Sequence, residues 1–215
     1  FNGFKDMVDA VNGVDVCIPV DVDDDKHNIH FEAGEQTLSG RDALNYVRER
    51  YVLSVTGDIG RMTRQQAFIA SMINKVVSGE TLSRPDRVYS FLNAATKSLK
   101  LDEDLANLPA LVDLAMQLKK TGLDDIKFLT VPFETYEPDP NRLVWAPRAD
   151  DLWERIRHDK PLGREFSLAS IKADDPVGTP TDSPSSPSAT ETPDQAAIEA
   201  AQEEAAARIA AGLCA

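Results

Sequence analysis

Apolar positions follow two different periods along roughly the first 160 residues. Helical spacing marks GFKDMVDAVNG, with Asn2 as the expected cap and Gly13 as the stop. Further helices are predicted at about 40–47, 59–77, 84–98 and 104–120, with a last short helix in VWAPRADDLWERIRHD. VDVCIPV and IKFLTVPF (126–133) are typical of strands. Strands interspersed with helices indicate the α/β class with a central sheet.

The composition changes at about Ile171. IKADDPVGTPTDSPSSPSATETPDQ is rich in Pro, Ser, Thr and Asp and lacks aromatic residues, so it buries too little apolar surface to offset its chain entropy. AAIEAAQEEAAARIAAGLCA favours a helix but has few bulky residues. We therefore expect one folded domain in residues 1–160 and a largely disordered acidic tail in residues 161–215.

Charge and composition exclude several classes of protein. A formal net charge of -13 disfavours a nucleic-acid partner, because a phosphate backbone needs a broad basic surface. The sequence contains neither an apolar run of about 20 residues nor a signal segment. Cys17 and Cys214 allow either one disulfide in an oxidising compartment or two unrelated thiols, and their number leaves both alternatives open.

Four arginines gather in YVRERYVLSVTGDIGRMTRQQAF (46–68) of this acidic chain. Arg48 and Arg50 alternate with Glu49, so an extended backbone would direct both arginines the same way. In the helix that follows, a wheel at about 100° per residue places Arg61 and Gln65 inside the apolar arc. A charged group there must be paired or face a wet cavity.

The same wheel predicts which residues of this helix face the core. The predicted core positions are Met62, Ile69, Ile73 and Val76, with Phe68 and Met72 adjoining them. Arg64 falls at the margin of that arc. Arginines beside a helix N-terminus suit a pyrophosphate, since the guanidinium fork matches phosphate oxygens. Surface salt bridges to neighbouring carboxylates are the alternative, and the spacing does not decide between the two.

Several spaced motifs carry a family resemblance. FNGFKDMVDAVNGVDVCIP, AGEQTLSGRDALNYVRERY, GDIGRMTRQQAFIASM and IKFLTVPF occur in an order that resembles the LytR–CpsA–Psr family of cell-wall glycopolymer ligases, in the actinobacterial style, over roughly residues 1–155. The resemblance implies an α/β/α sandwich with a central mixed sheet and a lipid tunnel. It implies a phosphotransferase that moves a glycan from a polyprenyl-pyrophosphate carrier to peptidoglycan, outside the cell membrane.

The resemblance also implies roles for individual residues. It assigns the pyrophosphate contacts to Arg48, Arg50, Arg61 and Gln65, and supporting roles to Asp58 and Arg64. Catalytic groups, the acidic ligands of Mg²⁺, part of the central sheet and a membrane anchor are all expected upstream of Phe1. This chain alone is therefore expected to be inactive, and no metal ligand is assigned within it.

The acidic run DVDDDKHNIH is the one stretch that could suggest a metal site within the chain. Its candidate ligands are Asp21, Asp23, Asp24, Asp25, His27 and His30. It lacks the ligand order and closing glutamate of a calcium loop, so a solvated loop is the preferred interpretation, with a candidate short strand near residues 29–31.

Three other functions stay open at this point. A polyprenyl-pyrophosphate phosphatase would use water in place of the sugar acceptor. A non-catalytic module would bind a lipid pyrophosphate or another cell-wall anion without turnover. An inert scaffold would use its arginines only in exposed salt bridges.

Overall fold

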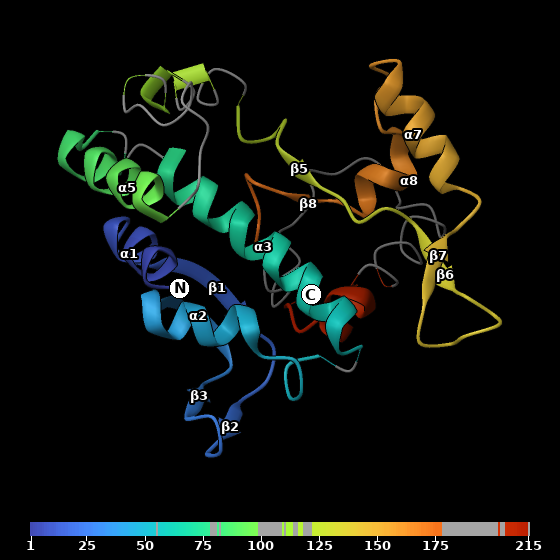
Figure 1. The fold of residues 1–215 in the computed structure, drawn as a ribbon, viewed down its shortest axis with the longest axis horizontal. Helices are drawn as coiled ribbons and strands as arrows, with labels where there is room; N and C mark the ends of the chain where they lie inside the picture. The colour runs from blue at the N-terminus through green and yellow to red at the C-terminus, as the bar shows by residue number, and fades with distance from the viewer. Residues whose placement is uncertain are drawn as a thin grey trace, which may run out of the picture.

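Figure 1 shows the computed structural model, which describes residues 1–54, 56–77, 81, 83–98, 109, 111–113, 116–117, 122–177, 202 and 205–214. The helices are α1 (Asn2–Ala10), α2 (Gly40–Arg48), α3 (Asp58–Val77), α5 (Pro85–Ser98), α7 (Ala149–Arg157) and α8 (Gly163–Leu168). The strands are β1 (Val14–Ile18), β2 (Val22–Asp24), β3 (Ile29–Phe31), β4 (Gly34–Leu38), β5 (Lys127–Phe128), β6 (Phe133–Thr135), β7 (Leu143–Trp145) and β8 (Ile171–Lys172).

The mixed helix-and-strand class is confirmed, and the helices fall close to the predicted ranges. Most of the predicted helix at 104–120 lies outside the described residues. Phe1, and not Asn2, occupies the cap position of α1. The predicted strand at 126–133 is split into β5 and the start of β6, since Pro132 has no N–H to donate to a ladder. No described helix is long and apolar enough to cross a membrane.

The described strands form four antiparallel pairs, β1–β4, β2–β3, β5–β8 and β6–β7, and not one continuous central sheet. The candidate short strand near residues 29–31 is confirmed as β3, whereas β2 and β4, in the polar segment around it, were not predicted. Val22 and Phe31 face each other in the β2–β3 pair and are buried, as is Leu38 opposite Val14 in the β1–β4 pair. A few inward apolar side chains are enough to form these hairpins despite the acidic residues between them.

The larger core lies where α1, α2 and α3 cover β1. Its buried side chains include Val8, Val14, Ile18, Tyr46 and Phe68, and α5 packs along α1 at its edge. Figure 1 shows α7, α8 and the β6–β7 hairpin at the opposite end of the molecule.

The face of α3 that packs against the rest of the chain differs from the predicted one. Met62 and Ile69 are exposed, whereas Arg64 is fully buried. The buried face is lined largely by small residues such as Gly60, Ala67 and Ala70. Small side chains allow close approach of neighbouring backbone. The prediction was therefore wrong for Met62 and Ile69, but Phe68 is buried as predicted, and Met72, Ile73 and Val76 pack against the buried clusters.

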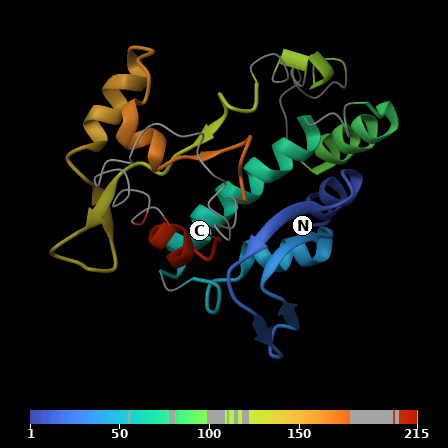
Figure 2. The same ribbon diagram turned by 180° about the vertical axis from the view of Figure 1, so that it is seen from behind.

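Part of the predicted disordered tail is ordered. Helix α8 forms, β8 pairs with β5, and residues 205–210 are helical. Figure 2 shows this last helix, in red, against the N-terminal half of α3. Leu213 and Ala173 pack with Ala67 and Ala70 of α3 in a second buried cluster. The prediction of disorder is therefore wrong for residues 161–177 and 205–214, while 178–201 lie outside the described residues.

A disulfide joins Cys17 of β1 to Cys214, with a Cα–Cα distance of 5.6 Å and a sequence separation of 197. The two cysteines are therefore paired and are not two unrelated thiols, a choice that the sequence left open. Beside it, the Ser54 hydroxyl donates to the Ala210 carbonyl at 3.2 Å. Gly212 has a φ of +78°, and a Cβ there would lie 2.0 Å from the Leu53 carbonyl oxygen, so only glycine fits. The C-terminal segment, residues 205–214, is therefore an integral part of the fold.

Candidate functional site

A pocket of about 410 Å³ opens where the C-terminus of α2, the first turns of α3 and the β2–β3 turn meet. Its lining residues are Asp24, His27, Ile29, Asn45, Arg48, Glu49, Arg50, Tyr51, Arg61 and Gln65. The four residues predicted to contact pyrophosphate are all among them. Their convergence follows from the end of α2 at Arg48, after which Glu49 is extended. Their contact with pyrophosphate stays a prediction.

Asp58, the first residue of α3, lies between two of these arginines. Its Oδ1 is 3.5 Å from Arg50 Nη1 and 3.3 Å from Arg61 Nη2. Arg50 also donates to the Tyr51 hydroxyl at 2.7 Å. All these groups are partly or largely exposed, and exposed pairs contribute little to stability. The ion pairs therefore leave the guanidinium groups able to bind an anion.

Arg48 has no carboxylate partner in the described part of the chain. Its guanidinium lies 5.1 Å from the centroid of the Phe1 ring, a cation–π contact. Gln65 donates from Nε2 to the Val47 carbonyl at 2.9 Å, which uses one of its two amide protons. The second amide proton can still serve a ligand.

Arg64 does not line the pocket but lies beneath it. It is fully buried, its Nη2 donates to the Glu49 carbonyl, and its Nη1 lies 3.9 Å from the Glu49 carboxylate. That carboxylate accepts the backbone N–H groups of Tyr51, Val52 and Leu53 at 2.5, 3.0 and 2.9 Å. Arg64 and Glu49 thus hold the segment that carries Arg50.

The charges lining the pocket are not balanced. Three arginines line it, together with the carboxylates of Asp24 and Glu49. Glu49 is buried and bonded to backbone N–H groups, and Asp24 is bonded to His27. Because three guanidinium groups outnumber two carboxylates in the lining, the lining carries net positive charge within a chain of net charge -13. Such a local field attracts anions.

The pKa of Glu49 makes the stability of the fold depend on pH. Burial by itself would raise the pKa, but the backbone N–H groups and Arg64 outweigh it and hold the pKa below the ordinary 4.5. A carboxyl with a lowered pKa stabilises the fold above its unfolded pKa and loses that effect as pH falls.

Between about pH 5 and 3, we expect the free energy of unfolding to fall less for Glu49→Gln than for the unsubstituted protein, because the glutamine side chain does not titrate. Urea titrations at each pH measure this, and equal slopes would contradict it.

His27 and Tyr51 also line the pocket. Tyr51 was not predicted as a site residue, and His27 was named only as a candidate metal ligand in a run interpreted as a solvated loop. The His27 Nδ1 lies 2.7 Å from Asp24 Oδ2, and the ring lies nearly parallel to that of Tyr51, with 6.4 Å between centroids. The hydrogen bond from His27 lowers the pKa of Asp24. The acidic composition around His27 had favoured a solvated loop, so only the His residue itself could have signalled this part of the site.

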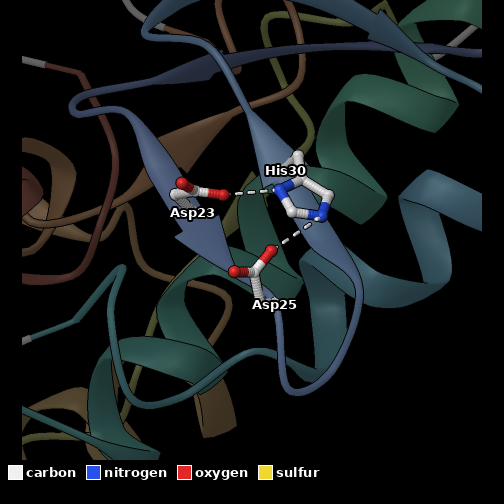
Figure 3. A group of neighbouring side chains, drawn as sticks. All are labelled: Asp23, Asp25 and His30. Carbon is white, nitrogen blue, oxygen red and sulfur yellow. Dashed lines mark hydrogen bonds and ion pairs between the residues drawn. The ribbon is translucent and has the colours of Figure 1, made fainter.

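Figure 3 shows a second group in the same hairpin, Asp23, Asp25 and His30. Its three potential ligand atoms lie within 4.8 Å of one another. Asp23 Oδ1 is 2.6 Å from His30 Nδ1, and Asp25 Oδ1 is 3.9 Å from His30 Nε2. All three residues are exposed, pair with one another and lie outside the pocket lining. We assign no metal to them.

Comparisons with known proteins complete the description. Cell wall biosynthesis protein LcpA of Corynebacterium glutamicum is 39% identical over 130 residues, which are 60% of this chain and 24% of LcpA. Polyisoprenyl-teichoic acid–peptidoglycan teichoic acid transferase TagV of Bacillus subtilis is 30% identical over 166 residues, 73% of this chain and 40% of TagV. The chain thus spans less than half the length of either relative.

Solved structures agree on the fold. The LytR-Csp2A-Psr enzyme from Actinomyces oris superposes with a TM-score of 0.56 at 21% identity, covering 72% of this chain and 60% of that one. The family model described as the LytR_cpsA_psr family matches residues 1–157, which include every residue that lines the pocket. The chain belongs to the LytR–CpsA–Psr family.

Proposed function

We propose that this chain is the C-terminal part of a phosphotransferase that moves a glycopolymer from a polyprenyl-pyrophosphate carrier to peptidoglycan. The observation that carries the proposal is the convergence of Arg48, Arg50 and Arg61 on one positively charged pocket. TagV, whose name describes a polyisoprenyl-teichoic acid–peptidoglycan transferase, supports the same substrates. The Mg²⁺ ligands and the membrane anchor remain expectations for a segment upstream of Phe1.

The arginines act by charge. In the transfer, an acceptor hydroxyl oxygen forms a bond to the phosphorus that bears the glycan. The P–O bond between the two phosphates breaks, and its electron pair leaves with the polyprenyl phosphate. Negative charge grows on that leaving phosphate, and preorganised guanidinium groups stabilise it more strongly than water does. Asp58 pairs with both Arg50 and Arg61, so its carboxylate bridges the two guanidinium groups.

The disulfide supports a place in the cell envelope. Disulfides persist in oxidising compartments and are rare in the reducing cytosol. The bridge between Cys17 and Cys214 therefore suits an extracytoplasmic protein, as do relatives named for cell-wall biosynthesis.

Calorimetric titration with geranylgeranyl pyrophosphate tests the proposal. We expect Arg48→Ala and Arg61→Ala each to weaken binding about 10- to 100-fold, because each removes a charge-assisted hydrogen bond to phosphate. Arg142→Ala is the matched control, since this exposed arginine pairs with Asp139 outside the pocket and removes the same charge. Equal losses in all three variants would indicate a general charge effect and would overturn the site.

Turnover is measured in the complete gene product, with a peptidoglycan fragment as acceptor. Transfer predicts a glycan–phosphate–peptidoglycan product, whereas the phosphatase alternative predicts the same release of polyprenyl phosphate without acceptor. Binding without either product would favour the non-catalytic module.

A further inference from the structure

The turn between β2 and β3 holds His27 in a defined position on the pocket wall. Asp24 ends β2, and its Oδ1 accepts the backbone N–H of His27 at 3.1 Å. Its Oδ2 lies 2.7 Å from the His27 ring nitrogen Nδ1. Asn28 follows with a φ of 53°, a left-handed conformation that turns the chain into β3. One carboxylate thus orients both the backbone and the ring of His27.

The face of the His27 ring also contacts an aromatic side chain, that of Tyr51. The Tyr51 ring lies parallel to it within 10°, and Tyr51 belongs to the segment whose N–H groups bind the buried Glu49. Tyr51 in turn accepts a hydrogen bond from Arg50. The imidazole is therefore connected, through one aromatic contact, to the arginines predicted to hold pyrophosphate.

The contact with Asp24 selects a tautomer. An ionised carboxylate only accepts, so a neutral imidazole beside it carries its proton on Nδ1 and leaves Nε2 as the basic nitrogen. No described residue forms a hydrogen bond with Nε2. The pocket wall thus carries an oriented imidazole whose Nε2, in the neutral form of the ring, is the proton acceptor beside the three arginines.

We propose that His27 is the base that accepts the proton of the attacking hydroxyl, and that Asp24 is its positioning residue. This inference rests on the function proposed above. As the acceptor oxygen bonds to phosphorus, its proton moves to Nε2, and the electron pair of the broken P–O bond leaves with the polyprenyl phosphate. The imidazolium then returns its proton to solvent or to that phosphate.

The same hairpin supplies a matched control. His30 also pairs through Nδ1 with an aspartate, at 2.6 Å from Asp23, and is as exposed as His27. It lies outside the pocket lining. His30→Gln therefore makes the same chemical change in the same element without altering the pocket.

The test compares His27→Gln, His27→Ala and His30→Gln in the complete gene product, using transfer from a polyprenyl-pyrophosphate-linked glycan to a peptidoglycan fragment. Glutamine preserves a donor for Asp24 but cannot accept the proton. We expect His27→Gln to lower kcat about 100-fold or more, with geranylgeranyl pyrophosphate affinity within about twofold of the unsubstituted protein. Added imidazole should restore part of the activity of His27→Ala, and His30→Gln should retain full activity.

Three outcomes would overturn the inference. They are full activity of His27→Gln, a loss of pyrophosphate affinity as large as the loss of rate, and no rescue of a folded His27→Ala by imidazole. Failure of the proposed function looks different, because the unsubstituted protein would then make no product or Arg61→Ala would bind normally.

Discussion

Replacing Arg64 with methionine should lower the free energy of unfolding by about 3–5 kcal/mol, the usual cost of breaking a buried ion pair from one side. Arg64 is fully buried and Glu49 is 4% exposed. Methionine fills much of the volume, so the effect comes from the lost charge and from the lost bond to the Glu49 carbonyl. Glu49 would then stay buried with only backbone N–H groups to stabilise its charge.

Urea unfolding of four proteins measures this pair: the unsubstituted chain, Arg64→Met, Glu49→Gln and the double variant. The double variant should lose less stability than the sum of the single losses, because the residues share one interaction. Arg61→Met is the control, as it removes the same charge one turn earlier at a partly exposed position and should cost about 1 kcal/mol or less. Equal effects of Arg64→Met and Arg61→Met would contradict the buried pair.

Removing the disulfide should lower the free energy of unfolding by about 2–5 kcal/mol, because the bond closes a very long loop in the unfolded chain. The two cysteines are 197 residues apart, and the entropy that the bond removes from the unfolded chain grows with this separation. In Cys17→Ser/Cys214→Ser, the C-terminal segment should also detach more often from α3. Its buried anchors are few, chiefly Ala211 and Leu213.

Urea titration and limited trypsin digestion check the two parts of this prediction. Cleavage after Arg208 should become faster in the double variant, since Arg208 lies in the segment that detaches. The unsubstituted protein treated with a reductant should match the double variant. An unchanged unfolding midpoint together with unchanged cleavage would show that packing alone holds the segment.

The sequence predicted what short-range patterns determine. Helices α2 and α3 were found from their spacing. Arg48, Arg50 and Arg61 line one pocket because the end of α2 and the start of α3 are close in the chain. The strands β2 and β4 were missed, since acidic residues concealed their few inward apolar positions. His27 was considered only as a metal ligand, and the acidic residues around it favoured a solvated loop.

Long-range packing accounts for the remaining differences. The buried face of α3 depends on close approach by residues 171–173 and 213, which no local pattern reveals. Arg64 is buried against Glu49, which lies fifteen residues earlier in the chain and lines the pocket. The order of the C-terminal segment depends on β1 and α3, at the far end of the sequence.

The position of the two cysteines also bears on the order of events during biosynthesis. Cys17 is synthesised 197 residues before Cys214, its partner in the disulfide. The helices and hairpins around β1 can form while later residues are still being added, because local elements form far faster than translation proceeds. Oxidation is therefore expected as a late step, after Cys214 has been synthesised and the C-terminal segment has docked against α3.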